Sequence, residues 1–141
     1  MKIAIGADHG GYELKSHLTE HLKSKGHQVF DFGTSSNEAV DYPVFARAVA
    51  EAVASGQAER GVMIDGAGIG SSMVANKVSG VRAALCTDLF AAGMSRRHND
   101  ANVLVLGGRV TGDVLAVEIL RTWLETPFEG GRHQRRLDMF G

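Results

Sequence analysis

Short apolar runs alternate with amphipathic stretches along the whole chain, and this alternation constrains the fold more than any other feature. The apolar runs are continuous rather than interrupted at every second position, which is typical of strands buried on both faces of a sheet. The predicted strands are Lys2–Ala7, Gln28–Gly33, Gly61–Ile64, Arg82–Cys86 and Val103–Leu106.

The stretches between these strands have the spacing of helices. Leucines recur at every fourth position over residues 14–22, and apolar residues do so over residues 45–53. Three further helices are predicted at Gly70–Val78, Leu89–Arg97 and Asp113–Leu124. Strands that alternate with helices favour parallel pairing through right-handed crossovers. The sequence therefore predicts a three-layer α/β/α sandwich with a five-stranded parallel sheet, similar to the Rossmann fold.

Length and composition limit the possible classes of protein. The 141 residues predict one domain, residues 1–141, and 44% hydrophobic with 22% charged residues is ordinary for a globular protein. A net charge of −1 gives no general attraction to nucleic acid or to an anionic membrane. No apolar run approaches membrane-spanning length, and the one cysteine, Cys86, fits a reducing compartment. We expect a cytoplasmic protein with neither nucleic acid nor membrane as a partner.

A glycine-rich segment, Asp65-Gly66-Ala67-Gly68-Ile69-Gly70-Ser71, follows the third predicted strand. Closely spaced glycines after a buried strand indicate a tight turn into a helix, where main-chain N–H groups are open to a ligand. The start of a helix also favours an anion. Asp65 places a carboxylate at the mouth of this turn, so a loop that binds an anion could also carry a catalytic group.

Other polar residues follow the remaining predicted strands. They are Asp8 and His9 after the first, Asp41-Tyr42-Pro43 after the second, Thr87-Asp88 after the fourth and Gly107-Gly108-Arg109 after the fifth. Ligands of open parallel sheets bind beyond the carboxyl ends of the strands. The fold prediction therefore gathers these residues near the glycine-rich segment.

Two more candidates lie outside these strand ends. His98, in a polar run between a helix and the last strand, can exchange protons near neutral pH; alternatively it is a cation at a helix C-terminus. Arg132 and Arg136 share a face if the basic tail, about residues 128–141, is helical. Two guanidinium groups on one face suit a phosphate, whereas the alternative is a solubilising tail.

Two other functions are weaker alternatives. His17 and His21 have the spacing of metal ligands on a helix, but no third ligand is evident, and no metal is expected. The segment Gly66–Gly70, with Asp88 about twenty residues later, partly matches a dinucleotide-binding motif. Its third glycine would fall at Ser71, and the turn follows the third strand rather than the first.

Five separated motifs together resemble the ribose-5-phosphate isomerase B family, which includes the galactose-6-phosphate isomerase subunits. They are Ile5–Gly11, Asp41–Pro43, the glycine-rich segment leading to Ala75-Asn76-Lys77, Arg97–Asn102 and Gly130–His133. The resemblance covers nearly the whole chain. It implies aldose–ketose isomerisation of a sugar phosphate without cofactor or metal. It also implies a homodimer or a dimer of dimers with active sites at the subunit interface.

The resemblance also implies roles for individual residues. Asp65 would be the base that moves a proton between C1 and C2, and His98 would assist ring opening with Asn99 beside it. N–H groups of the glycine-rich segment would hold the enediolate anion. The implied substrate-binding residues are Asp8, His9, Tyr42, Gly66, Ala67, Gly68, Gly70, Ser71, Asn76, Asn99, Arg109, Arg132 and Arg136, the last three on the phosphate.

Two positions differ from the commonest family pattern. Many members have cysteine as the base where this chain has Asp65, and threonine or serine where it has Ala67. Another branch has a glutamate base at the position of Ser71. Tetrose, pentose and hexose phosphates are therefore all candidate substrates. A catalytically silent sugar-phosphate-binding subunit and a nucleotide-binding protein are the alternative functions.

Overall fold

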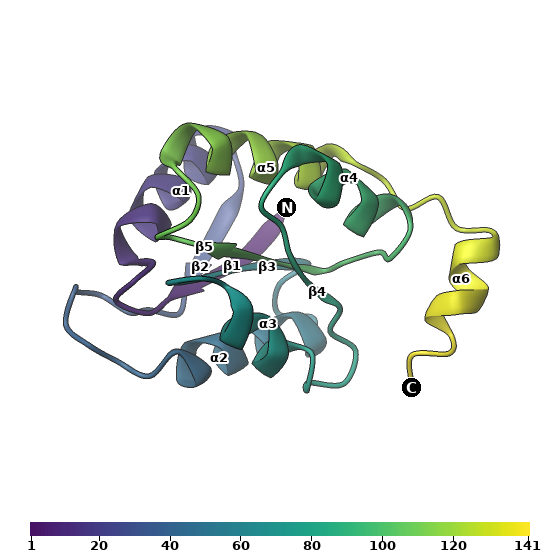
Figure 1. The fold of residues 1–141 in the computed structure, drawn as a ribbon, viewed down its shortest axis with the longest axis horizontal. Coiled ribbons are helices and arrows are strands. Elements are labelled where there is room, and N and C mark those ends of the chain that lie inside the picture. Colours follow the sequence, from purple (N-terminus) through teal and green to yellow (C-terminus); the bar gives the residue numbers. More distant parts are fainter.

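The computed structural model describes all 141 residues and has a five-stranded parallel sheet between two layers of helices (Figure 1). The strand order is β2-β1-β3-β5-β4, and every pairing is parallel. The strands are β1 (Lys2–Ala7), β2 (Gln28–Asp31), β3 (Arg60–Asp65), β4 (Ala83–Leu85) and β5 (Val103–Gly107). The predicted fold class is confirmed.

Helices cover both faces of the sheet, with α1, α4 and α5 on one side and α2 and α3 on the other (Figure 1). The helices are α1 (Tyr12–Ser24), α2 (Tyr42–Ala54), α3 (Ile69–Ala75), α4 (Leu89–Arg97), α5 (Asp113–Glu125) and α6 (Arg132–Leu137). The short helix α6 lies outside both layers, beyond the β4 side of the sheet (Figure 1). None of the six helices is long and apolar enough to cross a membrane.

Most predicted boundaries agree with the structure to within a residue or two. Strand β2 ends at Asp31 instead of Gly33, because Oδ1 of Asp31 accepts a hydrogen bond of 2.8 Å from the Gly33 N–H and turns the chain. Strand β4 is shorter than predicted. The Asn76 side chain occupies the outer backbone groups of Ala83, donating to its carbonyl at 3.0 Å and accepting from its N–H at 2.8 Å.

Two apolar cores, one on each face of the sheet, hold the layers together. The α1, α4 and α5 face buries 16 residues, among them Trp123 and Cys86, and the α2 and α3 face buries 12. Burial raises the pKa of the Cys86 thiol to about 11. This only thiol of the chain is therefore a core side chain rather than a replacement for a catalytic cysteine.

Parallel topology assigns every segment to one of two edges of the sheet. All strands end on one side of the sheet, here called the carboxyl edge. Each crossover helix brings the chain back to the opposite side, where the strands begin, here called the amino edge. Strand β2 lies on one side of β1, and β3 lies on the other side. The direction in which successive strands are added to the sheet therefore reverses between β1 and β3. Ligands of open α/β sheets bind at the carboxyl end of such a reversal, where Asp8 and Asp65 lie.

Candidate active site

Asp65, the last residue of β3, forms the centre of the carboxyl-edge site. Its side chain is 4% exposed. Oδ1 accepts a hydrogen bond from the Gly68 N–H, and Oδ2 accepts two from Ser71, at 2.7 Å from Oγ and 3.2 Å from the backbone N–H. A carboxylate has about four lone-pair sites. These bonds use three of them, so one lone pair of Oδ1 has no hydrogen-bond donor within the chain.

Part of the glycine-rich segment is therefore occupied by hydrogen bonds to the carboxylate of Asp65. Two of the N–H groups predicted to hold a reaction anion, those of Gly68 and Ser71, donate to Asp65 instead. The N–H groups of Ile69 and Gly70 lie in the first turn of α3 and have no acceptor within the helix. Together with the N–H groups of Gly66 and Ala67, which donate no backbone hydrogen bond, they are the part of this loop that can contact a bound anion.

The structure requires glycine at two positions of this loop, 68 and 70. Gly68 has a φ of +85°, in the left-handed region that favours glycine, and it starts α3. At Gly70, a Cβ atom would lie 2.3 Å from the Tyr42 hydroxyl oxygen. The missing side chain lets Tyr42, the first residue of α2, reach the first turn of α3. The structure thus brings the predicted residue Tyr42 to the loop.

Asp8 and His9 lie next to this loop at the end of β1. Asp8 is 6% exposed, its N–H donates to the Ile64 carbonyl at 3.2 Å, and its Oδ1 accepts from the Gly10 N–H at 2.8 Å. His9 accepts a hydrogen bond of 3.2 Å at Nδ1 from the Val40 N–H. Neutral His9 therefore carries its proton on Nε2, which can donate to a sugar or phosphate oxygen.

Arg109 joins the same edge from the end of β5. The Gly108 N–H donates to the Asp65 carbonyl at 2.7 Å, and the Arg109 N–H donates to the Gly66 carbonyl at 3.0 Å. These two bonds fasten the loop after β5 to the glycine-rich segment. The Arg109 side chain is exposed beside Gly66. Ala67 is also exposed in this loop.

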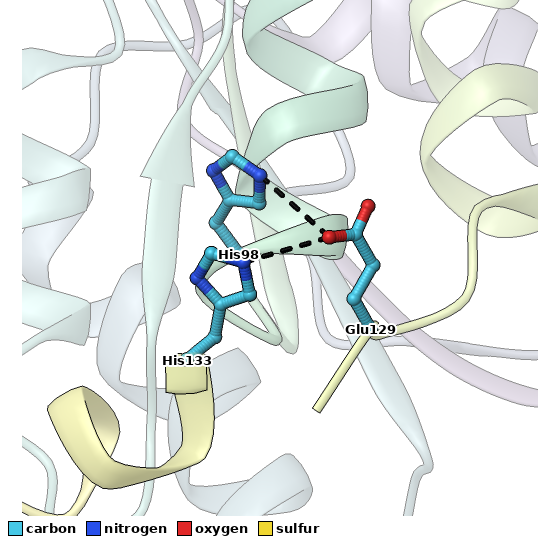
Figure 2. A group of neighbouring side chains, drawn as sticks. All are labelled: His98, Glu129 and His133. Carbon is cyan, nitrogen blue, oxygen red and sulfur yellow. Dashed lines mark ion pairs between the residues drawn. The ribbon is translucent and has the colours of Figure 1, made fainter. Parts of the chain in front are cut away.

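The other predicted catalytic residue, His98, lies at the amino edge as the C-cap of α4. Its ring stacks on His133 of α6 with centroids 4.1 Å apart and planes inclined by 13°. Oε1 of Glu129 lies 3.9 Å from His98 Nε2 and 3.5 Å from His133 Nε2, so one carboxylate faces both imidazoles (Figure 2). Neither Glu129 nor His133 was among the predicted site residues, although His133 ends the Gly130–His133 motif.

The ionisation of His133 is set by its burial and by the charges around it. His133 is 3% exposed, and its Nε2 has no hydrogen-bond partner. Burial, together with the positive charges of His98 and Arg132, lowers the pKa of His133 below its ordinary value of 6.5. His133 is therefore neutral near neutral pH.

Ligand atoms of His98, Glu129 and His133 lie within 4.8 Å of one another, a spacing that a metal ion could bridge. The ring planes argue against a preformed metal centre. A metal bound by imidazole lies in the plane of each ring along the nitrogen lone pair, and nearly parallel stacked rings direct their lone pairs side by side rather than to one point. The arrangement suits proton exchange.

Arg132 and Arg136 also lie at the amino edge, on α6. The tail is helical over Arg132–Leu137, which is the condition under which arginines four positions apart share a face, and both side chains are exposed. Asn99 follows His98 and lines a cavity of about 660 Å³ between the start of β4 and the C-terminal segment. Asn76 lines the same cavity, but its amide is held by the backbone of Ala83.

The weaker alternatives gain no support from the geometry. His17 is exposed on α1, and neither it nor His21 lies in a group of three metal-ligating side chains. Asp88, which the dinucleotide alternative requires as a ribose ligand, caps α4, and its Oδ1 accepts a hydrogen bond of 2.7 Å from the Ala91 N–H.

The predicted site residues thus divide into two groups. Asp8, His9, Tyr42, the glycine-rich segment and Arg109 lie at the carboxyl edge, while His98, Asn99, Asn76, Arg132 and Arg136 lie at the amino edge. A strand of five residues such as β5 spans about 16 Å at roughly 3.3 Å per residue. One small substrate cannot contact both edges of the same chain.

Comparisons with known proteins agree on one family. A family model described as Ribose/Galactose Isomerase matches residues 3–140. Ribose-5-phosphate isomerase B of Escherichia coli is 48% identical over 97% of this chain and 92% of its own. D-erythrulose-4-phosphate isomerase of Pectobacterium atrosepticum is 42% identical over 100% and 93%. The structure of Clostridium thermocellum ribose-5-phosphate isomerase B superposes with a TM-score of 0.99, at 56% identity over 100% and 95% of the two chains.

Proposed function

The chain belongs to the ribose/galactose isomerase family and is a sugar-phosphate isomerase, and from this premise we propose that it interconverts a phosphorylated aldose and its ketose through an enediolate. Ribose 5-phosphate is the first candidate substrate, and a four-carbon phosphate is the second, after the activities for which the two relatives are named. The observation that carries this proposal is the buried Asp65 carboxylate with one open lone pair, because enolisation needs a base.

The proton steps balance around this carboxylate. Asp65 takes the C2 proton of the open-chain aldose and returns it to C1, while O2 loses its proton and O1 gains one. Negative charge develops on the enediolate oxygens, which the N–H groups of Ile69 and Gly70 can stabilise. A fixed base typically contributes about 10²–10⁴-fold to such a step.

A complete site requires a second copy of the chain. We infer that the carboxyl edge of one subunit, with Asp65, faces the amino edge of its partner, with His98 and the α6 arginines. In this arrangement the ring-opening histidine and the phosphate clamp reach a sugar held at Asp65. The separation of the two edges within one chain supports this inference.

Exposed apolar side chains also support an interface between copies. Ile69 and Met73 on α3 are 54% and 64% exposed, and Leu89 and Phe90 at the start of α4 are 44% and 75% exposed. Large apolar side chains gathered near an unpaired edge strand, here β4, are typical of a surface that another protein covers.

A substrate panel tests the proposed activity. Four-, five- and six-carbon aldose phosphates, each with its unphosphorylated sugar as the control, would be assayed for ketose formation. Turnover of a phosphorylated aldose, and not of the free sugar, is the expected result. Binding of sugar phosphates without any turnover would instead identify a catalytically silent subunit and contradict the enzyme proposal.

A further inference from the structure

Two charged side chains beside His98, Arg96 and Asp100, make contacts that the proposed chemistry does not use. Arg96 lies in the last turn of α4 and is 5% exposed, which is unusual for an arginine. Asp100 lies two residues after His98. The two side chains form an ion pair of 2.8 Å across the turn that carries His98.

The backbone of Asp100 has a conformation that normally belongs to glycine. Its φ of +46° makes it the only non-glycine residue of the chain with positive φ. Its N–H donates to the Arg96 carbonyl at 3.2 Å, which closes α4 as a left-handed cap. Glycine is the usual residue at such a cap because it avoids the steric cost. The presence of Asp100 instead of glycine is therefore explained by the contacts of its carboxylate.

That carboxylate holds two arginines. Oδ1 accepts from Arg96 at 2.8 Å, and Oδ2 faces Arg82 at 3.5 Å, while the Asp100 carbonyl accepts from Arg82 Nε at 2.9 Å. Arg82 precedes β4, so these bonds fasten the His98 turn to the sheet. The turn is held at both its side chain and its backbone.

Arg96 extends the same support to the tail. Besides Asp100, its guanidinium donates to the Ala101 carbonyl at 2.6 Å and to the Thr126 carbonyl at 3.2 Å. Thr126 begins the segment that leads to Glu129, whose N–H donates to the Arg97 carbonyl at 3.0 Å. One buried guanidinium thus fixes the turn that carries His98 and the segment that carries Glu129.

We propose that Arg96 and Asp100 are positioning residues that hold the His98 imidazole in place for opening the sugar ring. Neither side chain is bonded to the His98 ring, so both act through the backbone. Arginine is required because its planar fork serves three acceptors at once, which a lysine ammonium on a flexible stem cannot match. This inference rests on the ring-opening role of His98 in the proposed function.

The test separates ring opening from proton transfer at carbon. Ribose 5-phosphate is mainly a closed furanose, whereas ribulose 5-phosphate has its O5 phosphorylated and stays open. Conversion of the aldose therefore needs ring opening, and exchange of a C1 hydrogen of the ketose with solvent deuterium does not. Asp100→Gly suits this test, because glycine favours the observed φ and only the carboxylate is lost. Arg96→Lys is the second variant.

The expected result is a fall of about tenfold or more in kcat for the aldose, with deuterium exchange into the ketose within about twofold of wild type. His98→Asn should give the same split. Arg97→Lys is the matched control and should leave both rates unchanged, because Arg97 is exposed and takes part in no ion pair.

Two results would overturn the inference. Equal losses in both rates would make Arg96 and Asp100 general structural residues, and unchanged rates in both variants would make them unnecessary. An inactive wild-type protein would contradict the proposed function instead. A His98→Asn variant without the split would contradict the role of His98, so the separate failures are distinguishable.

Discussion

Ser71 fixes the carboxylate of Asp65 through two hydrogen bonds to the same oxygen, Oδ2, one from its hydroxyl and one from its backbone N–H. The residue that ends β3 and the residue in the first turn of α3 are thereby locked together. Oδ1 accepts only one bond, from Gly68. The orientation of the proposed base, with its free lone pair on Oδ1, is thus a property of this loop.

Replacing Ser71 by alanine removes the hydroxyl donor and keeps the N–H. We expect Ser71→Ala to destabilise the protein by about 1.5–3 kcal/mol, the usual range for a hydrogen bond to a charged group. Urea unfolding at neutral pH measures this change. Ser72→Ala is the matched control, because the Ser72 hydroxyl donates only to the Ile69 carbonyl. Equal stability of the two variants would show that the Ser71–Asp65 bond contributes nothing.

Replacing Asp65 by asparagine removes the proton acceptor and nearly preserves the shape. Turnover of the sugar phosphate should fall by about two orders of magnitude or more while phosphate binding persists. Asp65→Cys, which restores the residue common in the family, should retain more activity than Asp65→Asn. Asp113→Asn, at the exposed start of α5, is the control. Near-normal turnover by the asparagine variant would exclude Asp65 as the base.

The arginines of α6 should act on the phosphate group. Arg132→Met and Arg136→Met should each weaken competitive inhibition by inorganic phosphate and raise KM at least several-fold, because each loses charge-assisted hydrogen bonds to the anion. Arg135→Met, an exposed arginine of the same helix, provides the comparison and should change little. Equal effects of all three substitutions would indicate a general charge effect of the tail.

Burial of neutral His133 predicts a pH effect on stability. Its pKa in the folded protein lies below 6.5, so the unfolded chain binds more protons as the pH falls below that value. Stability should therefore decrease on acidification from pH 7 towards 5. The facing groups are His98, Glu129, Arg132 and Arg136. His27, whose pKa is also lowered, contributes in the same direction.

The variant His133→Phe keeps an aromatic ring on His98 and removes the titration. Urea unfolding at pH 7.5 and 5.5 should show a smaller pH-dependent loss for this variant than for wild type. His17→Phe, on the exposed face of α1, is the control and should keep the wild-type loss. An unchanged pH dependence in His133→Phe would mean that His133 is not buried as a neutral group.

The sequence predicted the fold because its local signals agree with one another. Continuous apolar runs identified all five strands, and α4 has the predicted bounds Leu89–Arg97 because Asp88 caps its start. Glu129 and His133 escaped prediction, because their contact with His98 depends on how the tail folds back, which no local pattern encodes. The hydrogen bonds of Asp65 escaped for a similar reason, since they depend on the conformation of the side chain.

The division of the candidate site between two edges leads to the most direct test. The Asp65→Asn and Arg132→Met proteins would be unfolded together in equal amounts, refolded, and assayed at a substrate concentration well below KM, where the lost base and the weakened phosphate binding leave each parent with little activity. Half of the resulting dimers are then mixed, and one of their two sites has both native residues, so activity should recover to about a quarter of wild type. A mixture that stays as inactive as its parents, although mixed dimers form, would contradict a site shared between two copies.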